Sequence, residues 1–127
     1  MKQTTLRTVL AAAVIAAAAP QARAGTAIHA EVTVSSKAAS GDTNDARQSA
    51  DNLQFIGCGL TYDATSDKTE VNCVARDKFE KALNCSSTKP GFVAVAAGIG
   101  DYAFISFNCL GSELTKLHVE KFSFNLP

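Results

Sequence analysis

The sequence predicts a mainly β domain with one helix (α+β), a small antiparallel sheet or sandwich stapled by two disulfides. Several segments alternate apolar and polar residues with a period of two, which is typical of half-buried strands. One later segment repeats its apolar residues at the spacing of a helix face. The chain also contains four cysteines, an even number at well-separated positions, namely Cys58, Cys73, Cys85 and Cys109.

The N-terminus has the three parts of a secretory signal. Two basic residues, Lys2 and Arg7, precede an uncharged and mostly apolar stretch at 8–19, and small residues at Ala22 and Ala24 fit the recognition positions of a signal peptidase. The apolar stretch is much shorter than the roughly 20 residues that a membrane-spanning helix needs. We therefore expect cleavage after Ala24, a periplasmic or extracellular location, and no membrane span after cleavage.

Removal of residues 1–24 leaves 25–127 as a single disulfide-stapled domain. This part carries nine basic and twelve acidic residues, so its net charge is −3. A nucleic-acid-binding protein normally presents a basic face to the phosphates, whereas the cations here are scattered along the chain. Nucleic acid is therefore not an expected partner.

The first expected strand covers 27–35, where Ile28, Val32 and Val34 lie on one side. The following segment, 35–52, is polar and almost free of large apolar residues, and it predicts a long surface loop. Within that loop, Asn44 or Asp45 could cap a short helical turn.

A hairpin is expected next. Strands at 53–62 and 69–75 flank a polar turn at 63–68. Gly57 and Gly59 lie on the face opposite Cys58, which indicates a bulge or the close approach of another backbone.

After a turn at 76–81, the rest of the domain is expected to consist of strands around one helix. The segment 88–100 has apolar residues at helical spacing, with Thr88 as N-cap, Pro90 in the first turn and a glycine stop. A buried strand over 92–96 is the alternative. The expected strands in this part are 82–86, 102–109 and 114–124.

The hairpin geometry favours one cysteine pairing among three. The turn at 63–68 has the same midpoint as Cys58 and Cys73, so these residues face each other across the hairpin at a distance that suits a disulfide. Cys85 then pairs with Cys109 around the helix. Zinc ligation by the cysteines is disfavoured because zinc sites use closely spaced pairs.

Two His-x-Glu pairs form the leading candidate metal site. In a strand, residues i and i+2 share a face, so His29 with Glu31 and His118 with Glu120 each present two ligands on one side. If the first and last strands were neighbours, the four side chains would form a His2Glu2 cluster suited to zinc. If they are not neighbours, both pairs are polar residues on solvated strand faces.

No other catalytic or cofactor motif is recognisable. The serines do not lie in a G-x-S-x-G elbow, disulfide-bonded cysteines are not nucleophiles, and no cofactor is predicted. The acidic loop around Asp42 lacks the residue order of a calcium-binding loop.

Two aromatic residues lie on the faces opposite the apolar stripes of their strands. Phe55 and Phe104 are exposed unless the sheet is covered on both sides, and exposed aromatic residues on a rigid sheet indicate a partner site. The leading hypothesis is therefore a non-catalytic extracytoplasmic binding or interaction module whose partner is a protein, a glycan or another envelope component. A small metal-binding protein or enzyme using the two His-x-Glu pairs, and a structural envelope protein, are the alternatives.

Overall fold

The computed structural model describes residues 29–121. The expected signal peptide and Phe122 and Phe124 of the last expected strand lie outside the described residues. The elements in chain order are β1 (Thr33–Val34), β2 (Ala38–Asp42), α1 (Thr43–Gln48), β3 (Phe55–Asp63), β4 (Lys68–Arg76), β5 (Ala82–Ser87), α2 (Pro90–Ala97), β6 (Phe104–Leu110) and β7 (Glu113–Glu120). The predicted fold class is confirmed, with a second short helix added.

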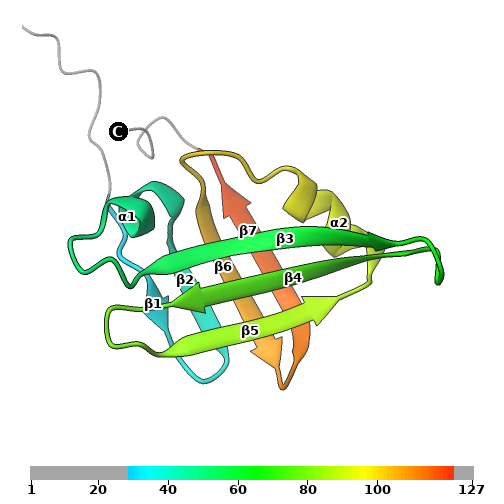
Figure 1. Cartoon of the computed structure of the whole chain (residues 1–127), viewed down its shortest axis with the longest axis horizontal. Helices are drawn as coiled ribbons and strands as arrows, with labels where there is room; N and C mark the ends of the chain where they lie inside the picture. Colours follow the sequence, from blue (N-terminus) through cyan, green and yellow to red (C-terminus); the bar gives the residue numbers. More distant parts are fainter. Residues whose placement is uncertain (1–28, 122–127) are drawn as a thin grey trace, which may run out of the picture.

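The seven strands form one mixed sheet that is folded into two layers. The strand order is β1-β2-β6-β7-β5-β4-β3, and every pairing is antiparallel except β5 with β7. In Figure 1, β3, β4 and β5 lie in front and cross over β2, β6 and β7 behind them. Among residues 29–121, the two layers are continuous only through the single parallel pair of Ser86 with Glu113.

The hydrophobic core fills the space between the layers. Alternate residues of β4 and β6 point inward, as the period of two predicts, and their outward neighbours are partly exposed. The largest fully buried side chains are Phe107, Ile105, Leu114, Val71, Cys73 and Cys85.

The segment 35–52 is not the long surface loop expected from its composition, because it contains β2 and α1. Its buried residues are small, as at Ala39 and Ala46, or polar, as at Asp42 and Asn44. Ala39 is buried, and a Cβ atom on Gly41 would lie only 2.9 Å from Cα of Val32. Val32 is the residue opposite Gly41 in the continued β1–β2 register, so the chain before β1 lies close against β2 here without large apolar side chains. Asp42 is the N-cap of α1, and its carboxylate accepts hydrogen bonds from the backbone of Asn44 and Asp45.

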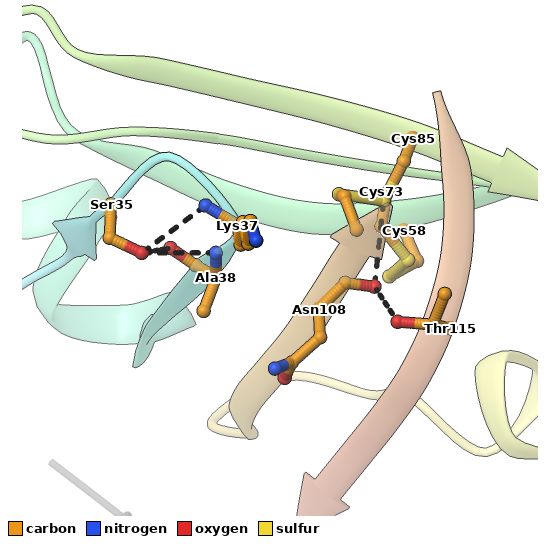
Figure 2. Close-up of a disulfide and its surroundings, with 9 residues drawn as sticks. Ser35, Lys37, Ala38, Cys58, Cys73, Cys85, Asn108 and Thr115 are labelled. Carbon is orange, nitrogen blue, oxygen red and sulfur yellow. Dashed lines mark hydrogen bonds between the residues drawn. A yellow bond between two sulfur atoms is a disulfide. The ribbon is translucent and has the colours of Figure 1, made fainter. Parts of the chain in front are cut away.

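The tight turn between β1 and β2 is closed by a backbone hydrogen bond from the Ser35 amide to the Ala38 carbonyl, and the Ser35 hydroxyl reinforces it. Ser35 Oγ accepts a hydrogen bond from the Ala38 amide at 3.0 Å and donates one to the Ala38 carbonyl at 3.1 Å. Figure 2 shows these contacts together with a third one, in which the Lys37 amide donates a hydrogen bond to Ser35 Oγ. Such local side-chain bonds are typical of serine in turns.

The segment around 88–100 is helical, as predicted, and the alternative strand over 92–96 is wrong. Helix α2 begins at Pro90, while Lys89 rather than Thr88 is the N-cap and makes no side-chain capping bond. Ala96 is buried, and Phe92, Val93 and Ile99 pack against the core. The helix therefore closes one side of the space between the layers.

Both predicted disulfides are confirmed. Cys58 and Cys73 are directly opposed in the β3–β4 ladder with a Cα separation of 4.0 Å, and Cys85 is bonded to Cys109 with a separation of 5.9 Å. Cys73 is also opposed to Cys85 in the β4–β5 ladder, so the front layer carries three cysteines in one row. Figure 2 shows this row above Asn108 of β6.

A bulge in β7 lies beside the second disulfide. The β6–β7 register shifts between Asn108 and Cys109, which leaves Thr115 as the extra residue. Thr115 Oγ1 donates a hydrogen bond to the Asn108 carbonyl at 3.2 Å. The bulge puts both Leu114 and Leu117 on the inner side despite their odd spacing.

Candidate functional site

The first component of the candidate site is Phe55 on the outer side of the front layer. Its neighbour Ile56 is buried, whereas the Phe55 residue is 41% exposed. The guanidinium carbon of Arg76 lies 5.1 Å from the centre of the Phe55 ring, and Arg76 Nε donates a hydrogen bond to the Leu53 carbonyl at 2.9 Å. This bond holds the cation over the ring, an arrangement that cation–π attraction favours.

The second component is the turn between β4 and β5, at the same end of the front layer. The buried carboxylate of Asp77 accepts hydrogen bonds from the backbone amides of Phe79 at 2.9 Å and Lys81 at 3.0 Å. The Phe79 residue is 74% exposed, and the Lys78 ammonium lies 5.6 Å from its ring centre. The buried carboxylate therefore orders a turn that presents an aromatic ring to solvent.

Lys78 also links this turn to the chain before β1. Its ammonium donates a hydrogen bond to Glu31 Oε2 at 2.8 Å. This hydrogen bond and the charge of Glu31 raise the pKa of Lys78 above its ordinary value, so the ammonium stays charged.

Together Phe55, Arg76, Lys78 and Phe79 form what we call the aromatic–cation surface. Each of its rings has a cation over it. Phe55 and Arg76 lie on paired strands, and Lys78 and Phe79 lie in the turn that Asp77 orders. Aromatic and arginine side chains are the types that most often dominate the energy of a protein interface. The surface can therefore contact both apolar and negatively charged groups without reorganising a loop.

The two aromatic residues singled out from the sequence do not form one patch. Phe55 is exposed, as its position on the strand suggested, but Phe104 is half-buried. The inward neighbours Ile56 and Ile105 place the two rings on opposite outer faces of the layers. The sequence reasoning did not single out Phe79, although its place in a polar turn was a usable signal.

The structure does not bring the predicted metal ligands together. His29 and Glu31 precede β1, while His118 and Glu120 lie on β7, and β2 and β6 separate these strands. His29 contacts Asp45, Glu31 contacts Lys78, and His118 contacts Glu120 at 2.7 Å. Within residues 29–121 there is no group of three or more metal-ligating side chains. The expected His2Glu2 cluster is therefore corrected to three separate polar pairs.

In one of these pairs, the carboxylate changes the pKa of the histidine. His29 Nδ1 lies 2.7 Å from Asp45 Oδ1, and the other carboxylate oxygen of Asp45 accepts a hydrogen bond from the Ala30 amide at 2.6 Å. The hydrogen bond and charge of Asp45 raise the pKa of His29 above 6.5, with a smaller contribution from Asp42. In the described part of the chain, no serine, threonine or cysteine side chain is hydrogen-bonded to the other ring nitrogen.

A titration should detect this pair directly. We expect Asp45→Asn to lower the pKa of His29 toward the ordinary value of 6.5, because the charge that favours the imidazolium is removed. Since the folded-state pKa is raised, the interaction stabilises the fold below 6.5 and is lost as the pH rises through the folded-state pKa. Ring-proton chemical shifts measured by NMR across this range give the pKa of His29.

The control for this titration is Asp63→Asn. This substitution also removes a carboxylate, but at the last residue of β3, which has no contact with His29. It should leave the His29 curve unchanged. A His29 pKa that does not move in Asp45→Asn would contradict the pairing.

Comparison with protein-family models, curated proteins and solved structures finds no match to this chain. Neither helix within residues 29–121 is long and apolar enough to cross a membrane. The two disulfides are typical of proteins that fold in an oxidising compartment outside the cytosol.

Proposed function

We propose that this chain is a non-catalytic binding module that acts outside the cytoplasm, and that the aromatic–cation surface contacts a partner protein. The single observation that carries the proposal is the exposure of two aromatic rings, Phe55 and Phe79, each with a cation held over it. A solvent-exposed ring loses its unfavourable hydration only when a partner covers it.

The proposed location is supported by two independent features. The N-terminal residues have the basic, apolar and small-residue regions of a signal peptide. The mature part has both of its disulfides in place and no free cysteine among the described residues. Such disulfides form and persist in the periplasm or outside the cell because no reducing system keeps thiols reduced there.

The rigidity of the surface supports binding rather than a mobile role. Arg76 is bonded to the Leu53 carbonyl, and the Phe79 turn is ordered by Asp77. Because the Arg76 side chain and the backbone of the Phe79 turn are held before a partner binds, less conformational entropy is lost on binding.

The test is retention of a partner by the immobilised, disulfide-bonded protein. We expect the exported protein to retain at least one protein from an extract of the cell envelope, identified by mass spectrometry. The double variant Phe55→Ala/Phe79→Ala should reduce that retention by about tenfold or more, since interface aromatic residues commonly contribute 2 kcal/mol or more.

Leu110→Ala is the matched control, because Leu110 is also a large exposed apolar residue but lies on β6. Both variants should keep the thermal stability of the parent to within about 1 kcal/mol, as surface substitutions usually do. Equal loss of retention in Leu110→Ala would show that the contact is not made by the aromatic–cation surface. Retention of a glycan or lipid but of no protein would also count against the proposal.

A further inference from the structure

The strand β3 is an open edge of the sheet. It pairs with β4 over nine residue pairs and ends the strand order. No backbone hydrogen bond joins its other side to any of residues 29–121. In Figure 1 it is the uppermost strand of the front layer, and no other strand runs alongside its far edge.

The register shows which backbone groups point out from this edge. The opposed pair Cys58–Cys73 has a Cα separation of 4.0 Å. In an antiparallel ladder, opposed Cα atoms are about 4.5 Å apart in a non-hydrogen-bonded pair and about 5.5 Å apart in a hydrogen-bonded pair. The short Cys58–Cys73 separation therefore identifies a non-hydrogen-bonded pair. The N–H and C=O of Cys58 therefore point away from β4. By the period of two, so do those of Ile56, Leu60 and Tyr62.

Helices α1 and α2 contact β3, but the strand itself lacks the sequence features that usually protect an edge. Natural edges carry lysine, proline or a bulge that prevents pairing with another chain. In β3 the only charged residue is its last one, Asp63, and the ladder with β4 has no register shift. Leu60 and Tyr62, at 44% and 61% exposed, add apolar surface beside the open backbone groups.

We infer that β3 pairs antiparallel with β3 of a second copy of this chain, around a two-fold axis at Gly59. The nine residues of β3 have Gly59 at their centre, so the strand can pair with itself along its full length. In that register Ile56 lies opposite Tyr62 of the partner subunit, and Cys58 lies opposite Leu60 of the partner subunit. These are the residues whose backbone groups point outward, so every open donor and acceptor of the edge is satisfied.

In this register the side chains of the two β3 strands fit one another, both at the ends of the paired strands and at the two-fold axis. Asp63 faces Phe55 of the partner subunit, beside which Arg76 of the partner subunit lies, so opposite charges approach each other. The two Asp63 side chains lie at opposite ends of the interface, about 27 Å apart for eight residues of strand. At the axis two glycines meet. A Cβ atom added to Gly59 would have no atom of this chain within 4 Å, so the fold of the monomer does not itself require glycine there.

The self-complementary pattern favours a second copy over an unrelated extended peptide. In an isologous interface every contact occurs twice, once on each side of the two-fold axis. A single favourable register of β3 with itself is therefore sufficient for a closed dimer. The joined sheet would carry two aromatic–cation surfaces on the same face. Dimerisation through β3 does not require either aromatic–cation surface to bind a partner.

The first test is sedimentation equilibrium of the exported, disulfide-bonded protein up to about 1 mM, the weak end of specific association. We expect a monomer–dimer equilibrium, and we expect Leu60→Pro to weaken it at least tenfold. Proline lacks the N–H that Leu60 directs away from β4, and an edge strand tolerates proline at such a position. A parent protein that stays monomeric throughout would overturn the inference.

The second test is cross-linking, which remains decisive if Leu60→Pro fails to fold. In Gly59→Cys the two new cysteines face each other at a Cα separation of about 4.5 Å, within the range of a disulfide. Gly57→Cys is the control. Its Cβ is equally unobstructed, but in the proposed register the two copies of residue 57 are about 14 Å apart.

We expect Gly59→Cys to form a covalent dimer on oxidation, with the new bond joining the two copies of residue 59 in unreduced peptide maps. Gly57→Cys should remain without this cross-link. Equal cross-linking of both variants, or of neither, would overturn the proposed pairing.

Discussion

Replacing Cys85 and Cys109 together by alanine is expected to lower the free energy of unfolding by about 3 to 5 kcal/mol, close to the upper end for a native disulfide. This bond joins β5 of the front layer to β6 of the back layer. In the described part of the chain, the sheet is continuous between these layers only through Ser86 and Glu113. Loss of the bond therefore leaves the two halves of the sheet with a single strand pair and the packing of the core.

The matched control is the double variant Cys58→Ala/Cys73→Ala, which we expect to cost about 2 to 3 kcal/mol. These residues lie in a ladder that already has nine opposed pairs. The loop closed by the bond is also shorter, with a separation of 15 rather than 24 residues. The loop-length effect alone is under about 1 kcal/mol, so most of the difference must come from the position of the bond.

Urea denaturation followed by circular dichroism gives both free energies. An equal loss in the two double variants, or a larger loss in Cys58→Ala/Cys73→Ala, would contradict the structural account of the layer junction.

Phe107→Ala is expected to destabilise the protein by about 3 to 5 kcal/mol, the usual range for a buried phenylalanine. Phe107 is completely buried, and it lies on β6 between Ala39 of β2 and Leu117 of β7. Because Ala39 is small, the Phe107 ring supplies most of the apolar volume at this cross-strand position. Its removal leaves a cavity that the surrounding strands close only in part.

Phe104→Ala on the same strand is the control for this substitution. Phe104 points to the outer face and is only half-buried, so we expect a loss of about 1 kcal/mol. Thermal and urea melts of the two variants measure the difference. Similar losses for Phe104 and Phe107 would mean that the space between the layers is not the main core.

Most of the fold could be predicted from local patterns. The period of two around Cys58 and Cys73 correctly placed two strands on either side of one turn, and their common midpoint gave the disulfide. The helical spacing from Phe92 to Ile99 correctly identified α2. These features depend on residues near each other in the chain, for which side-chain periodicity and turn geometry are sufficient evidence.

The segment containing β2 and α1 could not be recognised by hydrophobicity. Ala39 and Gly41 are buried because the neighbouring chain passes close by, not because they are large and apolar. A strand of small residues has the composition of a loop. Its assignment needs knowledge of the contact with Val32, which lies outside the strand.

The candidate site was predicted less completely, because it depends on strand order. The exposure of Phe55 followed from its position opposite Ile56 within one strand. The metal hypothesis required β7 to lie beside the segment with His29, and a separation of about 90 residues gives no local signal for that. The open edge of β3 is likewise a property of the whole sheet, since any strand can be an edge or a centre.

The two disulfides also determine how the protein would respond to a pulling force. Tension applied at the chain ends passes from Cys58 directly to Cys73 and from Cys85 directly to Cys109, so the segments between the bonded cysteines carry no load. Those segments contain the β3–β4 turn and the whole of α2. Fully extended, they amount to about 12 nm of chain that cannot be drawn out until the bonds are reduced. In an environment with shear or traction, the protein would behave as a short tether with a reserve of length released by thiols.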